Sequence, residues 1–364
     1  YNIDYTADGV TMIHWYFGVS AAGALIYYVG STLRHSLAHV RSLRIMDSGD
    51  ALVLDNSTIR HLQLLPYGDV AKSATLLGVL DVTKTPMGAR TMRNWISRPL
   101  ARSSDVNSRL DAVGLYVKER MLLTDLRRLL GGVRDLERLI QKVDSMRANP
   151  RDLRALALSL RPIPAIKSSC SIFSIASRLN DETEIVELID RAIAEEPPVM
   201  LTDGGFIASG FDTELDELRS IATEAQRYLA EFQTREQERT GIAKLKVKHV
   251  STFGYVIEIP KGSVAMAPAD YERRQTLTTG ERYTTAELKE YERKILGAED
   301  RAIAIEQRLF REILEKIALR TVEIQTSALA LGELDAILSL SDRALRGQDS
   351  STPCWAVRQL LSRS

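Results

Sequence analysis

The stretch that decides the fold reads LKVKHVSTFGYVIEIPKG and covers residues 245–262. Apolar and basic residues alternate at its start, and a second run rich in β-branched residues leads into a Pro-Lys-Gly turn. A period of two that is bounded by turn residues is typical of β-strands. We therefore expect a small β-rich module at residues 244–284.

Two long helices are expected on either side of this module. Apolar residues recur at three- and four-residue spacing through 211–243 and again through 285–345, which predicts a first and a second lever helix. At 1.5 Å per residue, helices of about 30 residues would span roughly 45 Å and hold the module far from the rest of the chain. The sequence Thr284-Thr285-Ala286-Glu287 predicts a capping box at the start of the second lever.

The remaining sequence predicts a helical core at residues 20–210, with a leader at 1–19 and a polar C-terminal tail at 346–364. Within the core we expect a buried helix from Ser20 to His39, a short strand pair in 41–54 and a hairpin at 199–207. The fold class is thus mostly α, with two long antiparallel lever helices and a small inserted β-rich domain at their tips.

Composition limits the classes of partner. The chain has 48 basic and 48 acidic residues, so attraction to phosphate has to come from local charge placement. Its two cysteines, Cys170 and Cys354, lack metal-ligand spacing and fit a reducing compartment. No apolar run reaches about 18 residues, which argues against a membrane partner. We expect a cytoplasmic protein.

Charge placement within the β-rich module leaves two interpretations open. Seven lysines and arginines stand against four acidic residues in 244–284, which is a local excess of three positive charges. Lysines commonly protect a solvated sheet edge from pairing with other chains. The same charges could also bind nucleic-acid phosphates.

Several short sequence motifs resemble those of the DNA mismatch repair protein family MutS. In the β-rich module and after it, they are Leu245-Lys246-Val247, Phe253-Gly254-Tyr255, Arg273-Arg274-Gln275-Thr276-Leu277, Glu281-Arg282-Tyr283 and Glu287-Leu288-Lys289-Glu290. Matching words in the same order occur earlier, including Thr85-Pro86-Met87-Gly88-Ala89-Arg90 and Arg147-Ala148-Asn149-Pro150-Arg151. The resemblance runs from about residue 20 to 345 and implies the core, lever and clamp domains, with 1–19 as a remnant of a connector domain or a leader.

The resemblance also implies contact with the backbone of duplex DNA through the clamp, without base readout. Val250, Thr278 and Thr279 depart from relatives, which carry lysine or amide side chains there, so we expect weak and only mildly salt-sensitive binding. The implied contact residues are Lys248, Val250, Ser251, Thr252, Lys261, Arg273, Arg274, Thr278, Thr279 and Gly280.

Other parts of the family pattern are missing from this sequence. Members bind ATP and Mg²⁺ in a separate domain whose P-loop needs Gly-x-x-x-x-Gly-Lys-Ser/Thr, and this chain contains no Gly-Lys dipeptide. The mismatch-reading domain is also missing, so we expect a non-enzymatic part with no cofactor that binds double-stranded DNA. A second MutS-like subunit or a MutL-like protein is a possible partner. The alternative is an ATP-independent helical scaffold that docks proteins along its levers.

Three further groups of residues are weaker candidates for a metal site or a catalytic site. His35 and His39 lie four residues apart but lack a third metal ligand. Asp81 with Arg90 and Arg93 is more typical of an ion pair that braces core helices than of a catalytic site. No base lies near Ser169-Cys170-Ser171 in the sequence. We therefore predict neither a metal site nor catalytic residues.

Overall fold

The computed structural model describes residues 12–33, 51–250 and 254–349. The chain divides into two compact units, residues 1–53 and 54–364. In the first unit, helix α1 (Met12–Leu33) confirms a helix in this region. Within this unit the side chains of Leu25, Tyr27 and Tyr28 are exposed, and the burial expected for this helix stays a prediction. The expected strand pair and most of the tail lie outside the described residues.

The second unit contains a helical body built around the long helix α14 (Thr321–Asp349). Ile324, Leu331, Leu334 and Leu338 on α14 are buried in the main hydrophobic core. The helices α2 (Asn56–His61), α3 (Leu76–Leu80), α4 (Pro86–Ser97), α5 (Ser103–Lys118), α6 (Arg120–Leu130), α7 (Leu136–Asp144), α8 (Pro150–Leu160), α9 (Ile163–Ser169), α10 (Phe173–Ala176) and α11 (Thr183–Ala192) complete this body.

The start of α4 is fixed to α14 by a buried carboxylate. Asp335 accepts hydrogen bonds from the backbone N–H groups of Lys84 and Thr85, the latter over 2.7 Å, and from the Thr85 hydroxyl. Thr85 in turn caps α4 by accepting the Gly88 N–H. A side chain at Gly88 would collide with Asp335. The sequence Thr85-Pro86-Met87-Gly88 is therefore explained by close packing of α4 on α14.

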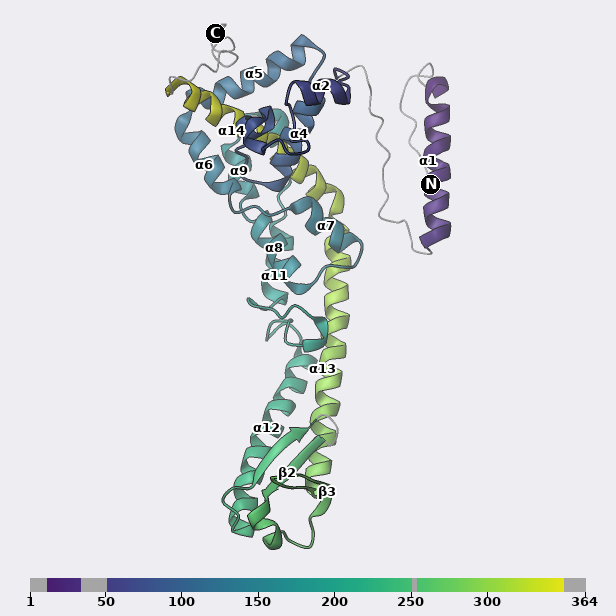
Figure 1. Ribbon diagram of the computed structural model, residues 1–364, viewed down its shortest axis with the longest axis vertical. Helices are drawn as coiled ribbons and strands as arrows, with labels where there is room; N and C mark the ends of the chain where they lie inside the picture. Colours follow the sequence, from purple (N-terminus) through teal and green to yellow (C-terminus); the bar gives the residue numbers. More distant parts are fainter. Residues whose placement is uncertain (1–11, 34–50, 251–253, 350–364) are drawn as a thin grey trace. The chain divides into compact units, whose positions relative to one another are not determined.

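Two long antiparallel helices leave the body, α12 (Thr213–Thr240) and α13 (Ala286–Ala318), and they run side by side to the sheet (Figure 1). The aromatic rings of Tyr228 on α12 and Tyr291 on α13 stack on each other, with their centroids 3.6 Å apart. Where they join the body, the buried Glu306 of α13 accepts hydrogen bonds from the N–H groups of Gly205 and Phe206 and from Arg219. The helix expected at 285–345 is divided, because α13 ends at Ala318 and α14 begins at Thr321.

The inserted domain is a four-stranded antiparallel sheet of order β1-β2-β4-β3. Its strands are β1 (Lys246–Val250), β2 (Gly254–Pro260), β3 (Glu272–Thr276) and β4 (Gly280–Thr284), and the 3₁₀ helix η4 (Lys261–Met266) follows β2. One face packs Ile257, Ile259 and Tyr283 against Phe232 of α12 and Leu288 of α13. This small core is separate from the core of the body.

The hairpin expected at 199–207 is wrong. Leu201–Asp203 form a 3₁₀ turn, η3, and Ile207 instead forms an isolated antiparallel bridge with Ile193. The reason is that Glu306 binds the N–H groups at the predicted turn and draws the segment against α13. None of the helices in the described ranges combines the length and the apolar character that crossing a membrane requires.

Candidate nucleic-acid interface

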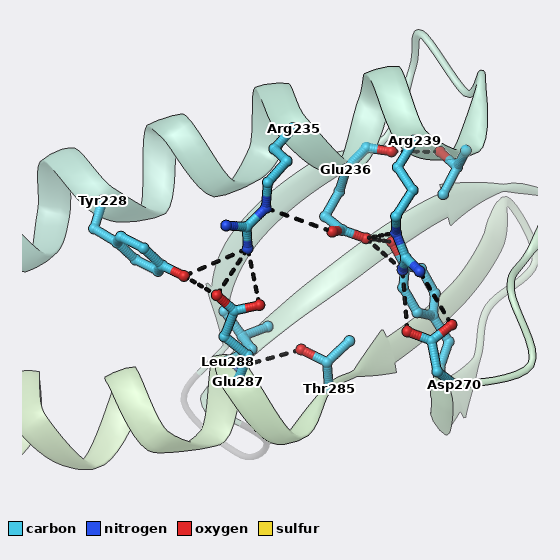
Figure 2. A network of polar contacts seen from close by, with 10 residues as sticks. Tyr228, Arg235, Glu236, Arg239, Asp270, Thr285, Glu287 and Leu288 are labelled. Carbon is cyan, nitrogen blue, oxygen red and sulfur yellow. Dashed lines mark hydrogen bonds and ion pairs between the residues drawn. The ribbon is translucent and has the colours of Figure 1, made fainter.

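The sheet is held on the two levers by polar networks at their ends (Figure 2). Glu287 of α13 accepts hydrogen bonds from the hydroxyl of Tyr228 and from Arg235, both on α12. Burial raises the pKa of Tyr228 to about 12, and the bond to Glu287 acts in the same direction. The phenol therefore stays protonated and keeps donating even at alkaline pH, where a free tyrosine would begin to ionise.

A second network fixes the segment before β3 to the end of α12. The buried Glu236 accepts hydrogen bonds from the Tyr271 hydroxyl at 2.7 Å and from Arg239, which also pairs with Asp270 at 3.1 Å. A buried carboxylate with three charge-assisted bonds orients its partners strongly. The sheet thus forms a rigid extension of the first lever.

The expected capping box does not form, because the helix begins one residue later than predicted. Thr285 rather than Thr284 caps α13, by accepting the Leu288 N–H, which makes Glu287 the second helical residue. Glu287 does not return to the helix N-terminus, because its carboxylate binds Tyr228 and Arg235 across the lever pair. The glutamate joins two helices where the sequence predicted a local cap.

The two turns predicted to contact DNA lie at opposite ends of the sheet. Val250 pairs with Gly254 at the start of β2, whereas Gly280 pairs with Pro260 at its end. Seven residues of extended chain separate these ends, roughly 20 Å. At the first end, Gly254 has φ +70° and packs so closely on Glu292 of α13 that a side chain would collide with that carboxylate. This end is therefore turned toward the levers.

The other end, where β1 begins, β2 ends and β3 joins β4, is here called the lysine end. It carries the exposed side chains of Lys244, Lys246 and Lys261, and the exposed Thr278 and Thr279 of the β3–β4 turn. The Lys261 N–H donates to the Thr279 carbonyl over 3.0 Å, so the turn and the end of β2 are joined. Among the residues that the structure describes, the three lysines have no carboxylate within 4.0 Å.

The other cations of the sheet are largely compensated. Across its outer face, Lys248 pairs with Glu258 at 3.3 Å, Arg282 approaches the same carboxylate at 3.6 Å, and Arg282 also donates to Gln275. Arg273 lies 3.5 Å from Glu281. Because a phosphate would have to compete with these carboxylates, Lys248 and Arg273 are weaker ligands than the lysines of the lysine end.

The predicted contact residues therefore separate into groups. Lys261, Thr278 and Thr279 meet at the lysine end, and Arg274 is an exposed cation on the edge strand β3. Val250 lies at the opposite end, next to Ser251 and Thr252, which fall outside the described residues. Gly280 is buried, and a side chain there would meet the Ile259 carbonyl, so its role is packing.

Lys244 and Lys246 were not among the predicted contact residues. The alternation of lysines in 244–248 was visible, but the sequence does not show which lysine faces Glu258. That information comes from the side-chain positions: in the strand register Lys246 lies opposite Glu258, but the ammonium group of Lys248 is the one that reaches that carboxylate.

The structure shows different ion-pair partners for Asp81 and Arg90 from those predicted. Asp81 pairs with Lys72 at 3.1 Å, and Arg90 instead binds Asp135 and Glu137 of α7. The bracing role of Arg90 is thus correct, but the partner is not. His35 and His39 lie outside the described residues. Within residues 12–33, 51–250 and 254–349, no group of three or more His, Cys, Asp and Glu side chains could hold a metal ion.

A helical body that carries a small sheet on two long antiparallel helices defines the chain as a core, lever and clamp protein. The family model of MutS domain III matches residues 57–341, and the chain belongs to this family. DNA mismatch repair protein MutS of Solibacter usitatus is 40% identical over 361 residues. The proteins of that name from Symbiobacterium thermophilum and Methanothrix thermoacetophila are 42% and 38% identical over 332 and 352 residues.

The match covers most of this chain but less than half of each relative. It takes in 96%, 89% and 94% of the chain, and 41%, 38% and 41% of the Solibacter, Symbiobacterium and Methanothrix proteins. The chain thus spans about two fifths of the length of these relatives.

Proposed function

We propose that the sheet contacts the phosphate backbone of duplex DNA through its lysine end. The observation that carries this proposal is that three uncompensated lysines, Lys244, Lys246 and Lys261, lie at the same end of the sheet as the exposed hydroxyls of Thr278 and Thr279. Ammonium groups release counterions when they bind phosphates, and hydroxyls add hydrogen bonds. Neither group distinguishes one base pair from another, so the contact is sequence-independent.

The position of the sheet supports this proposal. It lies on the ends of α12 and α13, and two polar networks fix it there. A rigid arm of roughly 45 Å lets the lysine end reach the side of a duplex while the body stays away from it. The lever itself is acidic, with exposed glutamates at seven-residue spacing at Glu217, Glu224, Glu231 and Glu238. Repulsion between this stripe and DNA would restrict contact to the tip.

We further propose that the chain serves as the core, lever and clamp part of a longer mismatch repair protein that encircles duplex DNA at the nucleoid. The names of the relatives support this role. In that protein, ATP and Mg²⁺ would bind to a separate domain, and a second MutS-like subunit or a MutL-like protein would be a partner.

The acidic stripe also favours a second candidate function, a docking arm for proteins. Four exposed glutamates on one face of α12 offer a regular surface to a basic helix. This alternative predicts that the charges of the sheet are irrelevant, and that substitutions on the lever face disrupt a protein complex.

Fluorescence anisotropy with a short labelled duplex tests the proposal with two matched variants of the same sheet. Lys246→Gln with Lys261→Gln removes two uncompensated charges, and we expect about tenfold weaker binding at low salt. Lys248→Gln with Arg273→Gln removes two charges that are already paired, and we expect less than a threefold loss. Equal loss in both variants would refute the assignment to the lysine end. No loss in either would favour the docking arm.

A further inference from the structure

A second cationic site lies on the body, away from the sheet. An open cavity of about 570 Å³ is bordered by α6, the C-terminal turns of α14 and the segment that precedes α4. Four basic residues line it, Lys84, Arg120, Arg127 and Arg128, against the single acidic residue Asp342. In a chain with no net charge, three excess positive charges at one cavity are a strong local concentration.

The carboxylates near this cavity compensate its cations only in part, and the buried Asp335 lies close enough to Arg127 for their charges to interact. Asp342 forms an ion pair with Arg346 at 2.9 Å, although its Oδ2 is buried and accepts no hydrogen bond from a described residue. Arg128 lies 3.7 Å from Asp125, and both side chains are more than half exposed, so that pair is weak. Among the described residues, Lys84 and Arg120 have no carboxylate within 4.0 Å. The cavity therefore presents cations that are free to bind an anionic ligand.

Arg127 adds a donor that lacks an acceptor. Its Nη2 donates to the Val82 carbonyl over 2.9 Å, whereas Nη1 is buried and has no hydrogen-bond partner in the described part of the chain. A buried donor without an acceptor is unfavourable, and an anionic oxygen that entered next to the guanidinium would remove this cost. A ligand with oxygen acceptors would therefore bind here more favourably than one without them.

The spacing of the cations favours an extended ligand. Arg120 and Arg128 lie eight residues apart on α6, which is about 12 Å along the helix, with Lys84 contributed by another segment. A single phosphate ion cannot contact all of them. Among the residues that the structure describes, no aromatic side chain lines the cavity, although single-stranded nucleic acids are usually bound by stacking on aromatic rings. Carboxylates along a polypeptide can match both the span and the charge.

We infer that this cavity binds an acidic segment of a partner polypeptide, through ion pairs of its carboxylates with Arg120, Arg127, Arg128 and Lys84. The site is independent of the lysine end and goes beyond the proposed contact with DNA. Exposed ion pairs are weak one by one and are screened by salt. Binding should therefore be moderate, reversible and strongest at low ionic strength.

Anisotropy of a fluorescein-labelled octaglutamate peptide, measured with the whole chain at low salt, tests this inference. Arg120→Gln with Arg128→Gln should weaken peptide binding about tenfold, which is the loss expected for two ion pairs. The matched control is Arg301→Gln with Arg311→Gln, which removes two exposed charges from α13. We expect the control to bind within twofold of wild type, and all three proteins to unfold at the same temperature.

Competition separates the possible ligands. Unlabelled octaglutamate should displace the probe, whereas tripolyphosphate and an oligothymidine of equal charge should do so at least about fivefold less well. No peptide binding, an equal loss in the control variant, or better competition by the oligothymidine would each overturn the inference. The variant Lys246→Gln with Lys261→Gln should bind the peptide normally, which distinguishes this site from the lysine end.

Discussion

The backbone N–H of Lys261 donates to the carbonyl oxygen of Thr279 over 3.0 Å and joins the end of β2 to the β3–β4 turn. This bond holds the start of η4, which carries the Lys261 cation, against the turn that carries the hydroxyl groups of Thr278 and Thr279. A phosphate at this point could accept from an ammonium group and a hydroxyl together. The proposed contact thus depends on sheet register as well as on composition.

Restoring a charge in this turn should strengthen DNA binding. Thr278 is exposed next to Thr279, so Thr278→Lys adds a fourth uncompensated cation to the lysine end. We expect tighter binding at low salt and a salt slope steeper by about 0.9, the value for one more neutralised phosphate. Thr278→Gln is the neutral control, and an equal gain from glutamine would show that charge is not the cause.

The chain should not prefer mismatched over matched duplex. Contacts of ammonium and hydroxyl groups with phosphates do not depend on the base sequence. The easier kinking of DNA at a mismatch strengthens binding only for a protein that inserts a side chain between the bases. Competition between a G·T duplex and its matched control should give equal affinities. A tenfold preference, about 1.4 kcal/mol, would contradict sequence-independent contact.

The junction of levers and body should depend on Glu306. This carboxylate is 2% exposed and accepts hydrogen bonds from Gly205, Phe206 and Arg219. Glu306→Ala leaves those donors without their acceptor, so we expect the free energy of unfolding to fall by roughly 3 kcal/mol in urea titrations. Glu312→Ala is the control, because its exposed carboxylate lies 4.0 Å from Arg308, and its effect should stay within about 0.5 kcal/mol.

Stability should respond to acid through Asp135. The hydrogen bond from Arg90 holds the pKa of Asp135 below its usual value of 3.8. Between the lowered pKa of the folded protein and 3.8, the unfolded chain binds more protons than the folded protein. The contribution of ionised Asp135 to the free energy of unfolding is therefore complete above pH 3.8, and it is lost as the pH falls through the pKa of Asp135 in the folded protein.

The variant Arg90→Gln isolates this effect. The difference in unfolding free energy between wild type and variant should be largest at neutral pH and should shrink below about pH 4. Urea titrations of both proteins at neutral pH and below about pH 4 measure this difference. An unchanged difference would show that Arg90 stabilises the body through packing alone.

The long-range plan of this fold could be predicted because it rests on periodicity. Spacings of three and four residues predicted the levers, and the structure gives α12 at Thr213–Thr240 and α13 from Ala286. Alternation and turn residues predicted the sheet. The break after Ala318 was not visible, because Thr321, Arg320 and Leu319 continue an acceptable helical pattern. At this break Arg320 forms an ion pair at 3.1 Å with Glu182, a residue far away in the sequence.

The candidate site was less predictable, because its properties depend on which residues face each other. Lys246 and Lys248 are equivalent in a charge count, yet Lys248 reaches Glu258 and Lys246 pairs with no described carboxylate. The pairing of Pro260 with Gly280 separates the two turns, and it brings together residues that are 20 positions apart in the chain. Local sequence patterns contain no information about either relationship.

The salt dependence of DNA affinity tests the central claim most directly. If Lys244, Lys246 and Lys261 each neutralise a phosphate, log K should fall with log salt at a slope of about −2.7 for wild type and about −0.9 for Lys246→Gln with Lys261→Gln. Lys248→Gln with Arg273→Gln should keep the slope of wild type. The same slope for all three proteins would contradict contact through the lysine end.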